Sequence, residues 1–223
     1  MKKQRSTATL MIYIFIAAQF LPIPLLYAFP VEQRIEMSLT LSLVASLLAT
    51  VAMIFINLRR KWTPEDSLSK KPSSSLGKVI LWGVVGFIGA ILIQYLTSII
   101  EIIIFGITPE SANTDLLLNL TTEYPLLVFS IVIFAPVTEE FVFRKAIFSQ
   151  LNVTAIGTVG SAVISALLFA IIHFDGHMLV YASLGLWFSY LYYKTNNIFT
   201  SMLAHGLMNS FVALPLFFPQ LLG

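Results

Sequence analysis

The sequence predicts an all-α fold, a polytopic membrane helix bundle of about seven transmembrane helices with a polar cavity in its C-terminal helices. Three observations support this fold class. Of the 223 residues, 57% are hydrophobic and only 11% are charged, whereas soluble chains carry about 25% charged residues. The apolar residues form successive runs of roughly 20 residues, the length that crosses a bilayer as a helix. Ionisable residues nevertheless recur inside several later runs, where burying them is costly unless they share a polar environment.

The composition also limits the classes of function. A formal net charge of +2 is too small to indicate a nucleic-acid partner, so the basic residues are interpreted as signals of membrane orientation. The chain has no cysteine, which excludes disulfides, cysteine-ligated metals and thiol catalysis.

The first apolar run covers 7–29 and follows a basic N-terminus. A cleaved signal peptide is the competing interpretation, but the run is too long for one and contains Pro22 and Pro24. We expect these prolines to kink or end the first helix near its outer side. A second span is predicted at about 37–58. Because basic residues mark cytoplasmic segments, the N-terminus is predicted to be cytoplasmic.

The linker 59–78 is the most polar stretch and is rich in Lys and Arg, which predicts that it is cytoplasmic too. The third span, about 79–105, carries three glycines at a spacing of three residues, Gly83, Gly86 and Gly89. A helix face of this kind favours close packing against other helices. We expect Glu101, near the end of this span, at the outer membrane interface; a cavity-lining role is the alternative.

The rest of the chain is predicted to cross the membrane four more times. Segment 106–123 contains acidic residues and no Lys or Arg, as expected outside the cytoplasm, and its leucines predict a short interfacial helix. The spans that follow are expected at about 124–150, 157–173, 178–193 and 198–214. We therefore predict one integral membrane domain, 1–223, with peripheral helices in 7–120, a functional core in 121–215 and an outside C-terminus.

The fourth span places Glu139, Glu140 and Arg144 inside an apolar helix. Each charge costs roughly 2.5–3.5 kcal/mol at the centre of a membrane helix, so pairing, water or proton uptake must offset it. Glu140 and Arg144 can pair, because four residues correspond to about 40° around an α-helix. Glu139 points elsewhere, about 140° from Arg144, and keeps the tunable proton affinity that a general base needs. The alternative is a structural ion pair with Glu139 lining the helix end.

Three more polar residues lie inside later apolar spans, namely His173, His205 and Asn209. His205 and Asn209 are four residues apart and share one helix face. Counted from the cytoplasmic helix ends at 1.5 Å per residue, Glu139 lies about 16 Å deep and His173 about 20 Å. On the same scale His205 and Asn209 lie at about 11 and 17 Å. These depths permit one buried polar cavity, which we expect to open towards the cytoplasmic half.

Two carboxylates, two histidines and an asparagine in one low-dielectric cavity suit a hydrolase. A water held between Glu139 and His173 could be deprotonated and added to a peptide carbonyl. His205 and Asn209 could then donate hydrogen bonds to the developing oxyanion. A metal alternative exists, because two histidines and a glutamate form a ligand set known for catalytic zinc. In this chain the set would be Glu139, His173 and His205, although the helical H-E-x-x-H spacing is absent.

Three motifs, Glu139-Glu140-x-x-x-Arg144, Phe169-x-x-x-His173 and His205-x-x-x-Asn209, occur in this order over roughly the C-terminal hundred residues. In this respect the chain resembles the CPBP family of intramembrane proteases, also called the Abi or CAAX-protease family. That family includes Rce1-like CAAX prenyl endopeptidases and bacterial bacteriocin-processing and self-immunity proteins. The resemblance implies that Glu139 activates water beside His173, that Glu140 and Arg144 support the site, and that His205 and Asn209 bind the oxyanion. Rce1-like relatives have eight spans against about seven here, a difference that concerns the periphery and the substrate entrance.

The function implied by the resemblance is that of an intramembrane endopeptidase with a glutamate-activated water and no firm cofactor, zinc being the alternative. Its partners would be the lipid bilayer and a membrane-embedded or lipidated substrate, of CAAX type or of bacteriocin- or pheromone-leader type, and no nucleic acid. The expected location is a prokaryotic cell membrane.

Two other hypotheses belong to different classes of protein. A catalytically idle family member could act by binding, in bacteriocin self-immunity or in the regulation of a sensor kinase. The complete set of motifs favours the enzyme over this alternative. A small transporter that relays protons would also explain buried charge, but it predicts an internal repeat, which the sequence does not show.

Overall fold

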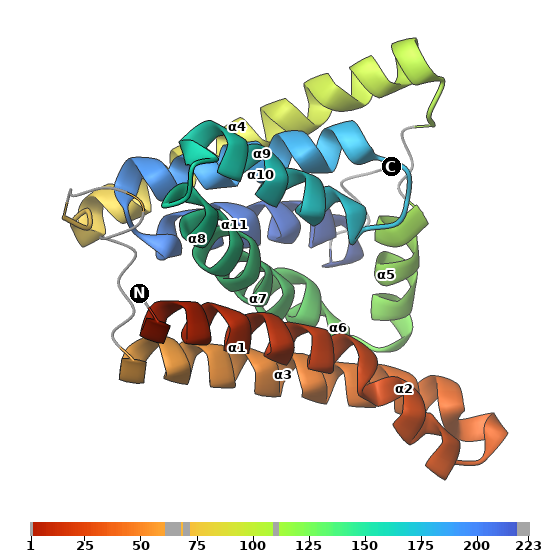
Figure 1. Ribbon diagram of the computed structural model, residues 1–223. Helices are drawn as coiled ribbons and strands as arrows, with labels where there is room; N and C mark the ends of the chain where they lie inside the picture. The colour runs from red at the N-terminus through yellow and green to blue at the C-terminus, as the bar shows by residue number, and fades with distance from the viewer. Residues whose placement is uncertain (1, 61–67, 69–71, 109–111, 218–223) are drawn as a thin grey trace.

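The computed structural model describes residues 2–60, 68, 72–108 and 112–217, and in these residues the regular elements are helices, with no strand (Figure 1). The N-terminal part contains α1 (Lys2–Phe20), α2 (Pro22–Leu25), the short turns η1 (Leu26–Ala28) and η2 (Val31–Gln33), α3 (Arg34–Arg60), α4 (Leu76–Ile100), η4 (Glu101–Phe105) and α5 (Ala112–Glu123). The C-terminal part contains α6 (Leu127–Phe129), η5 (Ser130–Phe134), α7 (Ala135–Glu139), η6 (Glu140–Phe148), α8 (Ser149–Asn152), α9 (Gly157–Ile171), α10 (Met178–Thr195) and α11 (Ile198–Phe217).

The predicted fold class is confirmed, because every expected span coincides with a helical stretch of the described residues. Three stretches are long and apolar enough to cross a membrane by length and composition, namely Thr7–Ala28, Val31–Arg59 and Leu76–Phe105. Gly157–Ile171 and Ile198–Leu214 are shorter apolar helices. The break expected at the prolines is also present, since α1 ends at Phe20 and α2 begins at Pro22.

Helix α4 packs against both α10 and α11, and its glycines make this contact possible. Gly83 lies against Leu203, Gly86 against Leu191 and Gly89 against Trp187, each so closely that an added Cβ would collide with that side chain. The Trp187 indole donates a hydrogen bond to the Gly86 carbonyl at 2.8 Å. The prediction that these glycines form a face for close packing is confirmed.

The fourth span is a broken helix in which the α-helical pieces α6, α7 and α8 alternate with the π-helical segments η5 and η6. Pro136, near the start of α7, has no N–H to donate. In a π-helix, the backbone N–H of the residue at position 136 would donate to the carbonyl five residues earlier, that of Ile131. Proline cannot make this hydrogen bond. The chain therefore leaves a backbone acceptor at Ile131 that another group must satisfy.

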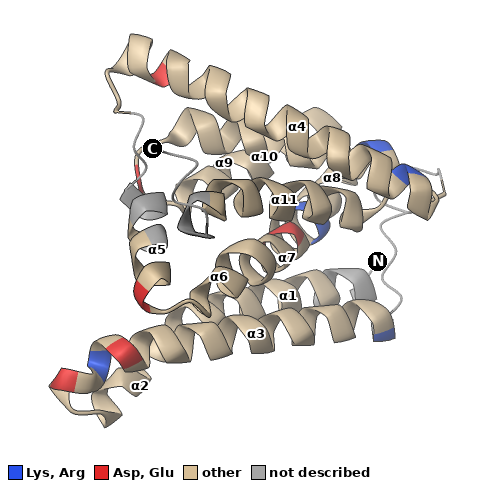
Figure 2. Ribbon diagram, turned by 180° about the vertical axis from the view of Figure 1, so that it is seen from behind, with Lys and Arg blue, Asp and Glu red and all other residues tan. Residues whose placement is uncertain are grey.

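The two ends of the bundle differ in charge (Figure 2). Lys and Arg gather at the end where α3 finishes and α4 begins, whereas most acidic residues lie towards α2, α5 and the far end of α4. Two hydrogen bonds tie the turn between α10 and α11 to the basic end: Ser74 N–H donates to the Thr195 carbonyl at 2.9 Å, and the Asn197 amide donates to Ser73 Oγ at 3.0 Å. We call this the basic end and the opposite one the acidic end.

Candidate active site

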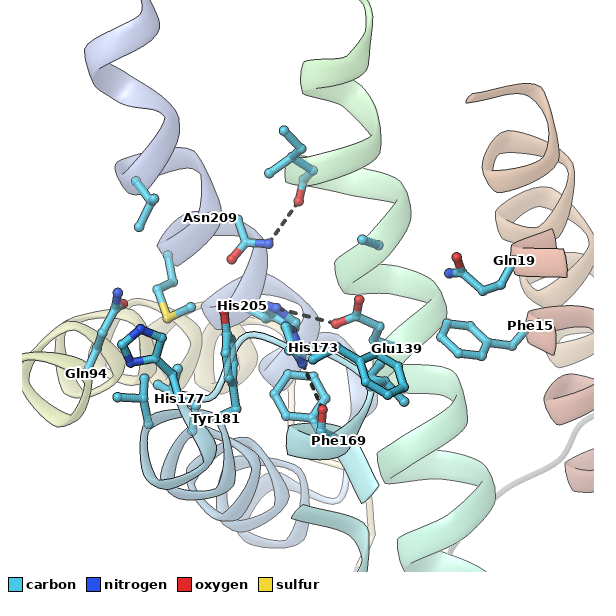
Figure 3. Close-up of a pocket in the computed structure, with 18 of the residues that line it drawn as sticks. Phe15, Gln19, Gln94, Glu139, Phe169, His173, His177, Tyr181, His205 and Asn209 are labelled. Atoms are coloured by element: carbon cyan, nitrogen blue, oxygen red, sulfur yellow. Dashed lines mark hydrogen bonds and ion pairs between the residues drawn. The ribbon is translucent and has the colours of Figure 1, made fainter. Parts of the chain in front are cut away.

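A cavity of about 650 Å³ lies among α1, α4, the broken fourth helix, α9, α10 and α11 (Figure 3). Four of the residues singled out from the sequence line it: Glu139, His173, His205 and Asn209. The prediction that these four side chains share one cavity is confirmed, although most of the other lining residues are apolar. Glu140 and Arg144 are fully buried beside the cavity, with 0% of either side chain exposed.

The cavity does not open towards the half of the bundle that we expected. Most of its lining residues come from the second halves of α1, α4 and α11, from the first half of the fourth helix, and from the adjoining ends of α9 and α10 with the turn between them. These parts of the helices lie away from the basic end. The cavity is therefore lined from the half of the bundle away from the basic end, and not from the basic half that we expected. The depths estimated from the helix rise placed the polar groups near the middle of the helices. They could not show at which end of the bundle the cavity lies, because this depends on how the helices pack.

Glu140 and Arg144 form the ion pair predicted from their spacing, with Arg144 Nη1 3.2 Å from Glu140 Oε1. Four residues remain close to one turn whether the helix is α or π. Arg144 Nη2 also donates to the Gly185 carbonyl at 3.3 Å. The guanidinium carbon lies 4.4 Å from the ring centre of Phe169 and 5.4 Å from that of Phe188. Aromatic faces stabilise a desolvated cation in this arrangement, so the pair is held by contacts from several helices.

The His205 imidazole lies between the two glutamates. Its Nδ1 is 3.1 Å from Glu140 Oε1, and its Nε2 is 3.8 Å from Glu139 Oε2. The ring is stacked on Phe188, with 4.8 Å between ring centres and 17° between planes. His205 thus connects the buried pair to the cavity, a role that its spacing from Asn209 did not predict.

The geometry of His173 determines which of its nitrogens can act as a base. Its Nδ1 is 2.8 Å from the Phe169 carbonyl oxygen, and because a carbonyl can only accept, Nδ1 carries the hydrogen. In the neutral ring Nε2 is then the acceptor. The imidazole also stacks on Tyr181, with 3.8 Å between ring centres and 20° between planes, and meets the edge of Phe169. The ring orientation and the tautomer are therefore both fixed.

Asn209 supplies the donor that Pro136 lacks. Its Nδ2 donates to the Ile131 carbonyl at 2.9 Å. Gly206, one turn earlier in α11, allows this approach, since a Cβ there would be 3.1 Å from the Val132 carbonyl oxygen. One of the two amide hydrogens of Asn209 thus holds α11 against η5, and the side chain also lines the cavity.

Sequence reasoning did not identify the polar network around the start of α10, which includes Tyr181, the residue that stacks on His173. Tyr181 donates its hydroxyl to Asp175 Oδ2 at 2.8 Å, and Asp175 Oδ1 accepts the His177 backbone N–H at 3.2 Å. His177 Nδ1 is 2.7 Å from Glu101 Oε2, while Glu101 Oε1 accepts the N–H groups of Leu179 and Val180.

Glu101 is therefore buried, with 1% of the residue exposed, and its carboxylate caps the start of α10. It is not among the residues that line the cavity, and its place at the outer membrane interface stays a prediction. The position of the Glu101 carboxylate in an apolar span indicated that it has a polar partner. Its partners are more than 70 residues away in the sequence, so no local spacing could identify them.

Among the described residues, no group of three or more His, Asp and Glu side chains is placed to hold a metal ion. Glu139, His173 and His205 all line the cavity, but as arranged they do not form the His₂Glu set considered above.

A membrane helix bundle with a carboxylate, two oriented imidazoles and a carboxamide around one cavity has the groups of an intramembrane hydrolase. Comparison with known proteins agrees with this class. Residues 121–211 match the model of the family described as type II CAAX prenyl endopeptidase Rce1-like. This region contains all six residues singled out from the sequence.

Three curated relatives extend the match. The chain is 32% identical to the "Putative membrane peptidase YdiL" of Bacillus subtilis over 221 residues, 96% of this chain and 89% of YdiL. It is 31% identical to the "Membrane-embedded CAAX protease MroQ" of Staphylococcus aureus over 216 residues, 92% of this chain and 87% of MroQ. It is 28% identical to the UPF0177 protein YxdF of Lactococcus lactis over 141 residues, 60% of this chain and 75% of YxdF. No solved structure matches the chain.

The chain thus belongs to the Rce1-like family of CAAX membrane proteases and is a prokaryotic integral membrane protein.

Proposed function

We propose that the protein is an intramembrane endopeptidase that hydrolyses a peptide bond with a water activated by Glu139. The observation that carries the proposal is the contrast between the two adjacent glutamates. Glu140 is fixed between Arg144 and His205, whereas Glu139 lines the cavity with 13% of its side chain exposed. Glu139 can therefore meet both a water and a substrate carbonyl, as a general base must.

In the proposed reaction His173 Nε2 accepts a hydrogen bond from the water and orients it. The water gives one proton to Glu139, and its oxygen bonds to the carbonyl carbon while the C=O electron pair moves onto the oxygen. When the C=O bond reforms, the C–N bond breaks and the amine leaves with the proton held by Glu139. The net reaction consumes one water and releases a carboxylic acid and an amine.

His205 and Asn209 are proposed to stabilise the oxyanion. His205 Nδ1 is within hydrogen-bond distance of Glu140 Oε1, at 3.1 Å, and its Nε2 faces Glu139 at 3.8 Å. We propose that Nε2 carries the hydrogen that is donated to the oxyanion. The Nε2–H then points towards Glu139 and the reacting centre. Asn209 has a second amide hydrogen beyond the one donated to Ile131. Two fixed donors of this kind stabilise a developing negative charge without reorganisation.

The substrate is proposed to be a membrane-associated peptide or protein, of CAAX type or of bacteriocin- or pheromone-leader type. The name of MroQ, a CAAX protease, supports the first type for that relative. The gathering of Lys and Arg at one end of the bundle supports a cytoplasmic N-terminus.

The decisive experiment compares wild type and Glu139→Gln in detergent, each with and without a strong chelator. The readout is cleavage of membrane peptides from the host, identified by mass spectrometry. We expect cleavage by wild type, insensitive to chelator, and none by Glu139→Gln. Glu123→Gln is the matched control, because Glu123 is exposed on α5 and lies outside the cavity.

Equal cleavage by wild type and Glu139→Gln would disprove the proposed role of Glu139. Cleavage that is lost with chelator and restored by zinc would replace the mechanism by a metal-dependent one. A folded wild type that cleaves nothing, but whose cellular effect survives Glu139→Gln, would instead indicate the catalytically idle binding protein.

A further inference from the structure

The cavity has an identifiable mouth. Among its lining residues, those most open to the surroundings are on α1 and on the turn after α9: Ile16 is 46% exposed, Phe20 63% and Phe174 88%. Gln19, between the two α1 residues, is exposed as well. Figure 3 places α1, with Phe15 and Gln19, across the cavity from α11 and α10. A substrate can thus enter between α1 and the turn that carries Phe174.

This mouth lies in the acidic half of the bundle. Ile16 and Phe20 are near the end of α1, which starts at the basic N-terminus, and Phe174 follows the end of α9. The deeper polar lining on α4, Gln94 and Ser98, lies near the end of a helix that begins beside Lys78. Helices of both chain directions line the cavity with the half that lies towards the acidic end. The placement of the cavity in that half therefore does not depend on a single helix.

The charge distribution assigns that half to a side of the membrane. Among the described residues, the basic end carries Arg59, Lys78 and Lys194, near the end of α3, the start of α4 and the end of α10. The acidic end carries Glu32, Glu36 and Glu123, with Arg34 the basic residue among them. An excess of Lys and Arg marks the cytoplasmic side, so the mouth lies on the opposite side.

We propose that the site takes its substrate from the non-cytoplasmic side of the membrane. The substrate class is a peptide segment at or within the outer leaflet, such as part of an exported peptide or the membrane anchor of an exported protein. The apolar rim suits such a segment, because exposed Ile and Phe side chains are compatible with lipid and with an apolar peptide. This inference rests on the proposed function for the reaction, whereas its assignment of sides can be tested without any activity.

Because the chain has no cysteine, single-cysteine variants can report which side of the membrane each end faces. Phe174→Cys marks the mouth, Gln33→Cys marks the acidic end away from the cavity, and Ser75→Cys marks the basic end; all three positions are exposed. Cells that express each variant are treated with a membrane-impermeant sulfonated maleimide, before and after permeabilisation. We expect Phe174→Cys and Gln33→Cys to react in intact cells and Ser75→Cys only after permeabilisation.

The reverse pattern would overturn the proposal and assign the mouth to the cytoplasm. If Phe174→Cys reacts in neither condition, Gln33→Cys and Ser75→Cys still decide the orientation, and with it the side of the mouth. A second measurement links the mouth to the reaction. Coupling a bulky impermeant maleimide to Phe174→Cys in intact cells should abolish Glu139-dependent cleavage relative to the same variant left unmodified, while modified Gln33→Cys keeps cleaving.

Undiminished cleavage after complete modification of Phe174→Cys would contradict substrate entry through this mouth. Absence of Glu139-dependent cleavage in every sample would contradict the proposed function, and the labelling result would still assign the side. The two failures are therefore distinguishable.

Discussion

Glu139 and Glu140 are adjacent in the sequence, yet their surroundings differ in every respect that matters for proton transfer. Glu140 has Arg144 at 3.2 Å and His205 at 3.1 Å, and none of its side chain is exposed. Removing Arg144 would leave a buried carboxylate without its cation, which typically costs about 3–5 kcal/mol. Glu139 has a longer contact to His205, at 3.8 Å, and lines the cavity. The adjacent pair thus supplies one structural and one reactive carboxylate.

We predict that Asn209→Ala lowers kcat by roughly 10²–10³-fold, the usual effect of removing one oxyanion donor. It should also destabilise the protein by about 1–3 kcal/mol, because the Ile131 carbonyl loses its partner. The measurement is kcat together with the Tm in detergent. Ser210→Ala is the control, since the Ser210 hydroxyl bonds within its own helix to the Gly206 carbonyl. If Asn209→Ala lowered the Tm but left kcat unchanged, Asn209 would be a structural residue only.

Tyr181 is predicted to be a positioning residue that acts through His173. Tyr181→Leu removes the stacked ring, worth about 0.5–1.5 kcal/mol, and should lower kcat roughly 2–10-fold with little change in KM. Tyr181→Phe keeps the ring but loses the hydroxyl bond to Asp175, so kcat should fall less. Steady-state kinetics of the two variants check this order.

A spectroscopic measurement separates positioning from a general loss of structure. The chain has three histidines, so the ring protons of His173 can be assigned by NMR. The Tyr181 ring face should shift the His173 signal upfield in wild type and Tyr181→Phe, and this shift should disappear in Tyr181→Leu. A constant shift in all three proteins would show that the stack is absent in solution.

At the scale of elements, the broken fourth helix determines how the site is assembled. Pro136 leaves an acceptor in η5, Asn209 satisfies it, and α11 is thereby held against the helix that carries Glu139. On the other side Arg144 donates to Gly185 in α10. The irregular helix therefore forms polar contacts with both α11 and α10. In a regular α-helix the Ile131 carbonyl would accept a hydrogen bond within its own helix and would not need the one from Asn209.

Close contact between α9 and α10 is expected to be essential for the Arg144 site. A Cβ at Gly185 would lie 2.8 Å from the backbone Cα of Ala166, so Gly185→Ala must push the helices apart. We predict a destabilisation of about 1–3 kcal/mol, as for other overpacked sites, measured as a lower Tm. Gly77→Ala is the matched control, because nothing lies within 4 Å of its Cβ position. Gly77 is the second residue of α4, so Gly77→Ala adds a methyl group in open space in the first turn, and the Tm should not fall. An unchanged Tm in Gly185→Ala would show that the α9–α10 contact can relax without cost.

At the scale of the whole molecule, the cavity needs helices from both halves of the chain. The wall opposite Glu139 includes Gln94 and Ser98 of α4, and α1 contributes Phe15 and Gln19. Glu101, just beyond α4, caps α10 from the other half. We propose that 1–223 acts as one domain in which 121–215 carries the reactive groups and the preceding helices complete the cavity.

This proposal predicts that residues 121–223 expressed alone give no stable, active protein. Without α4, the packing faces of α10 and α11 and the start of α10 lose their partners. Co-expression of 1–108 with 112–223 should restore Glu139-dependent cleavage, because the break falls in the connection before α5. Retention of the fragments on a size-exclusion column as one complex is the measurement. An active, monodisperse 121–223 fragment would show that the core is self-sufficient.

Much of this molecule could be predicted from local patterns. Apolar runs of sufficient length located the helices, and Pro22 and Pro24 located the break in the first span. The spacing of Gly83, Gly86 and Gly89 predicted a packing face, and the four-residue spacing of Glu140 and Arg144 predicted their pair. These features depend on neighbours within about one turn or on bilayer thickness, and both are readable from a single sequence.

The sequence by itself determined an all-helical membrane bundle, the ion pair and the set of polar residues that share one cavity. Tertiary structure alone decided that His205 lies between the two glutamates, that Asn209 bonds to Ile131 and that Glu101 pairs with His177. It also decided that the cavity opens at the acidic end. The reason is physical: each of these contacts joins groups on residues 65 or more positions apart, whose distance is set by how the helices pack and not by the period of any one helix.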